Sequence, residues 1–244
     1  MKAMILAAGR GTRLKPMTDT IPKALIPVKG VPMLEHAILK LKAAGFTQIV
    51  INIHHFGEQI IDFLNSKNNF GLTVAISDER ASLLDTGGGI KQARFFLDGD
   101  EPFLVHNVDI FSNVDLKEMY NAHVNSGALA TLLGSQRQTP RQLLFNADGR
   151  LCGWRNRDTG EVKSPAQSPA FEFDPSRHSE YAFGGVYVIS PEIFALMEDR
   201  SGKFPIIDFF LSICSDQPVH LYTKEGLQLI DAGKVKELNE LASS

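Results

Sequence analysis

Short apolar runs alternate with segments of helical spacing over the first 135 residues of the chain. Continuous apolar runs are typical of buried parallel strands, and apolar side chains three and four positions apart are typical of amphipathic helices. The predicted strands are 3–8, 48–53, 72–76, 102–106 and 128–133. The predicted helices are 33–44, 58–65, 88–97 and 115–124. This alternation predicts an α/β fold with a mostly parallel central sheet and helices on both faces.

The remainder of the chain is less regular. Apolar residues on both sides of Asn146-Ala147-Asp148-Gly149 predict a β-hairpin, because a glycine late in a polar run suits a tight turn. Residues 155–180 are polar and without period, and Ser190-Pro191-Glu192 predicts a capped helix start. Further predicted elements are strands at 181–189 and 219–222 and helices at 206–214 and 234–241. Since no linker divides the chain, we expect a single domain over 1–244.

Composition narrows the function classes. The 244 residues carry a formal net charge of −3, which argues against a general nucleic-acid-binding protein because such proteins usually carry a basic excess. No apolar run approaches the roughly 18 residues that a membrane span needs, so we expect no membrane association. The two cysteines, Cys152 and Cys214, form no CxxC motif, and we therefore expect a reducing, cytoplasmic location without a disulfide framework.

Positive charge gathers at the N-terminus. The first 25 residues hold five cations against Asp19 alone: Lys2, Arg10, Arg13, Lys15 and Lys23. A positive loop on an otherwise acidic chain predicts an anionic small ligand, although a solvated basic loop would have the same composition. Because ligands of parallel sheets lie at the carboxyl ends of strands, this loop is well placed after the first strand.

The loop itself reads Gly9-Arg10-Gly11-Thr12-Arg13. Glycines directly after a parallel strand allow backbone amides to approach a phosphate or a base edge. A dinucleotide-binding fingerprint would need a third glycine at position 14, which is Leu14, and a Gly-Lys-Ser/Thr ending of a phosphate-binding loop is absent. Further along, Pro22 and Pro27 stiffen the chain on both sides of Lys23, which can meet a phosphate as a point charge.

The run Leu6-Ala7-Ala8-Gly9-Arg10-Gly11-Thr12-Arg13-Leu14, with Pro16, Thr18 and Pro22-Lys23 after it, closely resembles the signature of sugar-1-phosphate nucleotidyltransferases. The notable departure is Ala24, where proline is common. Asn107-Val108-Asp109 and Leu229-Ile230-Asp231-Ala232-Gly233 resemble later family segments. Asp85-Thr86-Gly87-Gly88-Gly89-Ile90 resembles a segment of the short uridylyltransferases that act on N-acetylmuramate 1-phosphate. The resemblance implies a Rossmann-like nucleotidyltransferase fold, with a nucleotide-binding core over 1–135 and a sugar-binding elaboration over 136–244.

The same resemblance implies roles for individual residues. Arg13 would grip the leaving pyrophosphate and Lys23 would lie near the α-phosphate and the incoming sugar phosphate. Asp109 and Asp231 would hold Mg²⁺, although an aspartate at a strand end is often only a turn or cap residue. Nucleotide contacts are expected from Ala7, Ala8, Gly9, Gly11, Thr12, Glu79, Thr86 and Gly87, and sugar contacts from Asn107 and Gly184. Thr86 could equally be a helix cap, and Gly184-Gly185 a β-bulge.

The implied reaction joins an NTP and a sugar 1-phosphate, two small-molecule substrates, into an NDP-sugar and pyrophosphate. UTP with N-acetylmuramate 1-phosphate is the best match. Mannose- or heptose-1-phosphate guanylyltransferase, glucose-1-phosphate thymidylyltransferase, choline-phosphate cytidylyltransferase and a non-catalytic nucleotide-sugar sensor stay open. Longer family members often carry a Glu-Lys-Pro motif after the hairpin, and here the comparable stretch is Trp154-Arg155-Asn156-Arg157 followed by Glu161-Val162-Lys163. The sequence therefore leaves the cation for the sugar phosphate unassigned.

Overall fold

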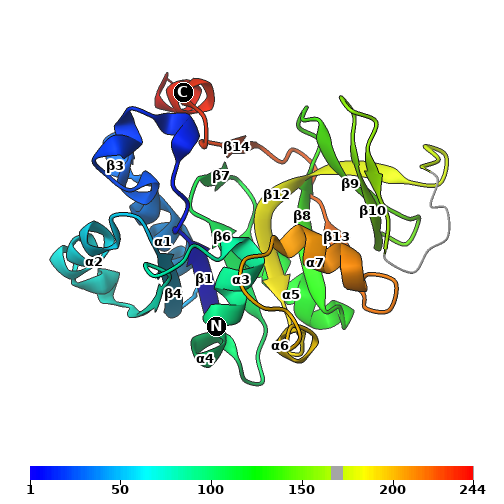
Figure 1. Ribbon diagram of the computed structural model, residues 1–244, viewed down its shortest axis with the longest axis horizontal. Helices are drawn as coiled ribbons and strands as arrows, with labels where there is room; N and C mark the ends of the chain where they lie inside the picture. The colour runs from blue at the N-terminus through cyan, green and yellow to red at the C-terminus, as the bar shows by residue number, and fades with distance from the viewer. Residues whose placement is uncertain (166–172, 244) are drawn as a thin grey trace.

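The computed structural model describes residues 1–165 and 173–243, and a ten-stranded sheet lies at the centre of these residues (Figure 1). Four neighbouring strands run parallel in the order β5-β4-β1-β6. Strands β1, β4 and β6 are short apolar runs that are largely buried, as the sequence pattern predicts, whereas β5 at the sheet edge is mostly half-buried. Their bounds are β1 Lys2–Leu6, β4 Gln48–Ile53, β5 Thr73–Asp78 and β6 Phe103–Asn107.

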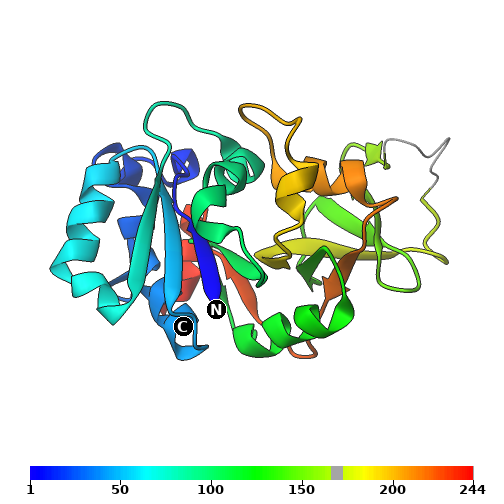
Figure 2. The same ribbon diagram turned by 90° about the horizontal axis from the view of Figure 1, so that it is seen from below.

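The sheet continues beyond β6 with mixed directions. Strand β12 (Ser179–Ile189) is antiparallel to β6, and β8 (Ala130–Ser135) is antiparallel to β12. Strand β8 therefore runs in the same direction as β6 and β1, and β13 (Val219–Tyr222) pairs with it in parallel. The predicted hairpin is present as β9 (Arg141–Phe145) and β10 (Leu151–Asn156), followed by β11 (Val162–Lys163). This ribbon lies at the opposite end of the molecule from α2 (Gly57–Ser66) in both views (Figures 1 and 2).

Helices cover both faces of the sheet. Successive residues of β1 point to opposite faces, and because they are apolar on both, each face is buried under helices. Ala3 and Ile5 belong to a buried cluster with Ile38 and other residues of α1, α2, α5 and α8. Met4 belongs to a second cluster with Phe209 and other residues of α3, α4, α6 and α7. The bounds are α1 Met33–Ala43, α3 Asp85–Gln92, α4 Arg94–Leu97, α5 Leu116–Ser126, α6 Ile193–Leu196, α7 Ile206–Ile213 and α8 Val235–Ser243. The predicted fold class is confirmed.

Two small strand pairs and four single-turn segments complete the described residues. Strand β2 (Pro27–Val28) pairs with β3 (Val31–Pro32), and β7 (Ile110–Ser112) pairs antiparallel with β14 (Leu229–Asp231). The single turns of 3-10 helix are η1 Thr12–Leu14, η2 Met17–Asp19, η3 Lys23–Leu25 and η4 Asn68–Gly71. The β7–β14 pair brings the end of the chain back to the segment that follows β6.

Two local predictions differ from the structure. The helix expected at 88–97 is two helices, the first beginning at Asp85 and the second at Arg94, with a break at Ala93. The first-turn amides of Gly87 and Gly88 donate to the carbonyl of Phe204, which supports the earlier start. The hydroxyl of Ser190 does not cap α6: it donates instead to the carbonyl of Ala128, and α6 begins at Ile193.

The aperiodic segment expected at 155–180 includes the end of β10 and all of β11, and its residues 166–172 lie outside the described residues. In the described ranges, every helix is too short or too polar to cross a membrane.

Candidate active site

The loop after β1 is anchored at its first two residues. The backbone amides of Ala7 and Ala8 donate to Oδ1 of Asn52 at 2.6 and 3.3 Å, and both alanines are buried. Asn52 lies near the end of β4, beside the end of β1 in the parallel sheet. Gly9 and Arg10 follow the two buried alanines and are exposed. The loop thus leaves the sheet from a fixed point and opens to solvent at the carboxyl edge of the strands.

Glu79 lies beneath this loop. Its Oε1 accepts from Nδ2 of Asn52 at 2.7 Å, and its Oε2 accepts from the backbone amide of Leu84 at 3.0 Å. The side chain is only 2% exposed. A Cβ on Gly89 would lie 2.6 Å from Oε1, so a glycine is required for this close approach. The structure therefore connects Glu79 to the N-terminal loop through Asn52.

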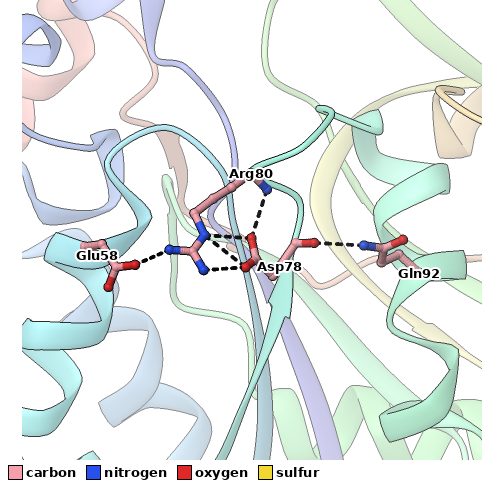
Figure 3. A network of polar contacts seen from close by, with 4 residues as sticks. All are labelled: Glu58, Asp78, Arg80 and Gln92. Carbon is pink, nitrogen blue, oxygen red and sulfur yellow. Dashed lines mark hydrogen bonds and ion pairs between the residues drawn. The ribbon is translucent and has the colours of Figure 1, made fainter.

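Surface contacts hold the backbone on both sides of Glu79 (Figure 3). Nε of Arg80 donates to both carboxylate oxygens of Asp78 at 2.9 Å, and Nη1 of Arg80 pairs with Glu58 on α2. Nε2 of Gln92 on α3 donates to the Asp78 carbonyl at 2.8 Å. The Arg80 side chain and amide hold the pKa of the Asp78 carboxyl below its usual range. Two helices and one strand end are thereby fixed around the buried glutamate.

Gly11 turns the loop back toward Lys23. Its φ of 63° lies in the left-handed region that favours glycine. A Cβ at this position would lie 2.7 Å from Cγ2 of Thr18 and 3.0 Å from Cβ of Lys23. The Thr18 hydroxyl donates to the Gly11 carbonyl at 3.0 Å, which closes the turn. Thr12 and Arg13 follow in η1 with exposed side chains.

Four of the predicted charged residues meet in space. Nζ of Lys23 pairs with Oδ2 of Asp109, and each side chain is 12% exposed. A Cβ on Gly233 would lie 2.8 Å from Oδ1 of Asp231, 2.9 Å from Oδ2 of Asp109 and 3.0 Å from Nη2 of Arg13. The β7–β14 pair and the Ala232 amide, which donates to the Asp109 carbonyl at 2.9 Å, hold the two acidic segments together. Two carboxylates and two cations thus converge at one point.

Arg137 also lies at this point, and sequence reasoning missed it. Its Nη1 donates to Oδ2 of Asp231 at 3.2 Å, while the Gly233 amide donates to Oδ1 of Asp231 at 3.0 Å. Burial alone would raise the pKa of the Asp231 carboxyl, but the Gly233 amide, Arg137 and Lys23 outweigh burial and hold the pKa below its ordinary value. The sequence did contain a signal, since Arg137 is a cation that closely follows the strand predicted at 128–133. Ligands of parallel sheets lie at the carboxyl ends of the strands.

Thr86 and Gly87 face the segment before α7. The Thr86 hydroxyl accepts from the Ile206 amide at 2.9 Å, and the Gly87 amide donates to the Phe204 carbonyl at 2.9 Å. A Cβ on Gly87 would lie 2.3 Å from the Phe204 ring. The N-cap position of α3 is Leu84, so Thr86 is not the side-chain cap. These glycines allow close packing between α3 and the chain that leads into α7.

Asn107 and Gly184 border the middle of the sheet. In the described part of the chain, Oδ1 of Asn107 is buried without a hydrogen-bond partner. A Cβ on Gly184 would lie 2.7 Å from the Leu133 carbonyl, and one on Gly185 would lie 3.0 Å from Nδ2 of Asn107. The register between β12 and β8 shifts between Phe183 and this strand's later residues, as expected for the bulge alternative. Gly184 therefore packs on β8, and Gly185 packs on Asn107.

The chain matches one known protein family along nearly its whole length. The family model described as "Nucleotidyl transferase" matches residues 2–244. The chain is 32% identical over 229 residues to N-acetylmuramate alpha-1-phosphate uridylyltransferase of Caulobacter vibrioides, covering 92% of this chain and 89% of that protein. It is 50% identical over 115 residues to the protein of that name from Neisseria meningitidis, covering 47% of this chain and about half (49%) of the relative.

A comparison with solved structures concerns the fold. A crystal structure of a putative glucose-1-phosphate thymidylyltransferase from Bacillus anthracis superposes with a TM-score of 0.82 at 22% identity, covering 100% of this chain and 94% of that one. At that identity the likeness concerns the fold, and it confirms the predicted Rossmann-like nucleotidyltransferase architecture. The predicted resemblance is confirmed by the family model and by the uridylyltransferase relatives. The chain belongs to the nucleotidyl transferase family, whose model spans nearly all of it.

Proposed function

We propose that this chain transfers a nucleotidyl group from UTP to N-acetylmuramate 1-phosphate. In that reaction a phosphate oxygen of the sugar 1-phosphate bonds to the α-phosphorus of the nucleotide, and the bond to pyrophosphate breaks. The convergence of Arg13, Lys23, Asp109 and Asp231 beside the glycine-rich loop carries the proposed nucleotidyl transfer. The similarity to the Caulobacter vibrioides uridylyltransferase supports the choice of substrates. A site with two cations and two carboxylates suits a reaction between two anions, where charge neutralisation and positioning dominate.

The cations have separate tasks in this proposal. Arg13 is exposed in the described structure, and its planar guanidinium offers a donor fork that matches the oxygens of pyrophosphate. Lys23 is a compact charge held by Asp109 and lies closer to the interior, where it would neutralise the α-phosphate and the incoming phosphate. The pair holds Lys23 beside the proposed metal ligand before substrate arrives.

The acidic pair fits Mg²⁺. The ion prefers oxygen ligands and commonly takes one or two carboxylates, with substrate phosphates and water completing its shell. Asp109 Oδ2 and Asp231 Oδ1 supply two such oxygens around one point, and no cluster of three or more His, Cys, Asp and Glu side chains exists among the described residues. When bound, Mg²⁺ would neutralise phosphate charge beside Lys23 and Arg13. We therefore propose that Asp109 and Asp231 are the metal ligands.

The remaining predicted contacts follow from the placement of the loop. The nucleotide would lie along Ala7, Ala8, Gly9, Gly11 and Thr12, with Glu79, Thr86 and Gly87 bordering the base and ribose and Asn107 and Gly184 bordering the sugar. The half over 1–135 would then bind the nucleotide and the half over 136–244 the sugar. Free thiols at Cys152 and Cys214, both with pKa values raised by burial, are consistent with a reducing, cytoplasmic location.

A substrate panel tests the proposal. Pyrophosphate release is measured with Mg²⁺ for UTP, GTP, CTP and dTTP, each against N-acetylmuramate, mannose, glucose and heptose 1-phosphates and phosphocholine. We expect the highest kcat/KM for UTP with N-acetylmuramate 1-phosphate, and UDP-N-acetylmuramate as the product by mass spectrometry. Faster turnover of another pair would reassign the substrates within the family. Tight nucleotide binding without turnover of any pair would favour a non-catalytic sensor.

A further inference from the structure

Arg137 stands on the side of the charged cluster that faces the second half of the chain. Because β8 runs in the same direction as β6, the end of β8 lies at the same edge of the sheet as the glycine-rich loop. Arg137 is the second residue after this strand. Its Nη1 donates to Asp231 Oδ2, and its Nη2 donates to the carbonyl of Phe183 at the β12 bulge, both at 3.2 Å. The side chain thus joins the charged cluster to the strand that crosses into the second half.

The guanidinium has donors left over. Its Nε is buried and has no hydrogen-bond partner among the described residues, and the two bonds that Arg137 makes are long. A guanidinium carries five N–H donors, of which these contacts use two. A buried donor without a partner is destabilising, because it loses the hydrogen bond to water and gains none in return. Nε itself is buried, but the side chain is 30% exposed, so a ligand can reach the remaining donors on Nη1 and Nη2.

The geometry of the reaction decides whether these donors face the leaving pyrophosphate or the incoming sugar phosphate. In phosphoryl transfer the attacking and leaving oxygens lie roughly in line on opposite sides of the phosphorus. Arg13 Nη2, Asp109 Oδ2 and Asp231 Oδ1 gather around the Gly233 backbone, whereas Arg137 contacts the other Asp231 oxygen, Oδ2. If the loop and Arg13 hold the leaving pyrophosphate, the incoming phosphate arrives from the side of Arg137.

The three cations of the stretch that follows the hairpin, Arg155, Arg157 and Lys163, already have partners. Nε of Arg155 pairs with Oε1 of Glu180 at 3.0 Å, and Arg157 pairs with the other oxygen of the same carboxylate. Lys163 pairs with Asp208 at 3.3 Å and lies over the ring of Trp154. Arg137 is also held by a carboxylate, but that carboxylate is itself part of the proposed site.

We propose that Arg137 is the cation that receives the phosphate group of the sugar 1-phosphate. This inference rests on the proposed function and names a residue that the sequence left unassigned. Arg137 keeps its contact with Asp231 Oδ2 and directs its remaining donors at the incoming phosphate. A guanidinium is suited to this double task because its planar fork can bind two anions in fixed directions.

The test separates phosphate binding from support of Asp231. We compare wild type, Arg137→Gln and Arg137→Lys, with Lys163→Gln as the matched control for a cation on the same half. Steady-state kinetics give KM for UTP and for N-acetylmuramate 1-phosphate, and calorimetric titration with N-acetylmuramate 1-phosphate in the absence of UTP gives its Kd. Thermal unfolding checks that each variant is folded. If Arg137→Gln does not fold, Arg137→Lys still tests the inference.

We expect Arg137→Gln to raise both KM and Kd for the sugar phosphate by roughly tenfold to a hundredfold, the equivalent of one charge-assisted contact, with KM for UTP within about twofold. Arg137→Lys should recover part of the loss, and Lys163→Gln should behave as wild type. A raised KM for UTP and a raised Mg²⁺ requirement, with unchanged Kd for the sugar phosphate, would show support of Asp231 only and overturn the inference. If wild type neither binds nor converts any sugar 1-phosphate, the proposed function fails first and the inference with it.

Discussion

Replacing Gly233 by alanine tests whether the space between the two aspartates supports the reaction. Gly233 is buried, and its backbone lies outside the left-handed region, so alanine fits its conformation. The added Cβ would lie 2.8 Å from Asp231 Oδ1, 2.9 Å from Asp109 Oδ2 and 3.0 Å from Arg13 Nη2. Gly233→Ala therefore inserts one methyl group among three charged side chains and removes none of them.

The size of the effect follows from the displacement. Non-bonded heavy atoms are in good contact at about 3.5 Å, so the charged groups must move by roughly half an ångström or more. A misplacement of about 1 Å costs an enzyme on the order of a hundredfold in rate. We therefore expect kcat/KM to fall by roughly tenfold to a hundredfold, equivalent to about 1.4–2.7 kcal/mol in transition-state free energy. The free energy of unfolding should change by less than about 1 kcal/mol, because alanine also lowers the entropy of the unfolded chain.

Pyrophosphate release at varied Mg²⁺ concentration measures this prediction, and urea unfolding measures the stability. The Mg²⁺ concentration for half-maximal rate should rise, since the methyl group occupies space between the two carboxylate oxygens. Lys234→Ala, which removes an exposed side chain next to the site, is the control and should leave the rate unchanged. A folded Gly233→Ala enzyme with wild-type kcat/KM and Mg²⁺ dependence would refute the reasoning.

Three further predictions concern the loop, the metal and a buried histidine. Gly11→Ala should lower the free energy of unfolding by roughly 1–2 kcal/mol in urea titration, because alanine is strained at a φ of 63°; an unchanged midpoint would contradict the proposed need for glycine. Chelation of Mg²⁺ should abolish pyrophosphate release without changing the circular dichroism spectrum, and full activity in chelator would remove the metal assignment. Burial and the nearby His220 lower the pKa of His123 to about 4 from an ordinary 6.5. The folded state therefore resists protonation of His123, whose stabilising contribution is complete above pH 6.5 and is lost toward pH 4. The free energy of unfolding should therefore fall by about 3 kcal/mol between pH 6.5 and pH 4. In urea titrations His123→Asn should show a smaller fall over this pH range, and an equally steep fall would contradict the prediction.

The regular elements could be predicted because their apolar patterns are local. The strand at Gln48–Ile53 and the strand at Val219–Tyr222 have the predicted bounds, and the hairpin follows from its turn residues. The pair of β7 and β14 could not be predicted, because each strand has three residues and they lie far apart in the sequence. The start of α3 at Asp85 could not be predicted, because its first-turn amides bond to the carbonyl of Phe204, which reaches the helix only in the folded chain.

The charged cluster could be predicted from the sequence only in part, because only some of its residues follow a predicted strand. Lys23 and Asp109 could be placed at the carboxyl edge from the strands that precede them, and the structure pairs them. Asp231 reaches that edge only through the β7–β14 pair, so its position came from family resemblance. Arg137 was overlooked because the direction of β8 is known only once β12 is seen between β6 and β8. The roles of these residues in binding and catalysis stay predictions.

The most direct test of the central claim compares wild type with Asp109→Asn and Lys23→Ala in pyrophosphate release, using the nucleotide and sugar phosphate that wild type converts fastest. Both variants remove one member of the buried ion pair, so thermal unfolding must first show that each is folded. The account predicts that turnover falls by on the order of a hundredfold or more in both variants, since each loses charge placed at the reacting phosphates. Folded variants with wild-type, Mg²⁺-dependent turnover would show that the reaction takes place elsewhere and would contradict the account.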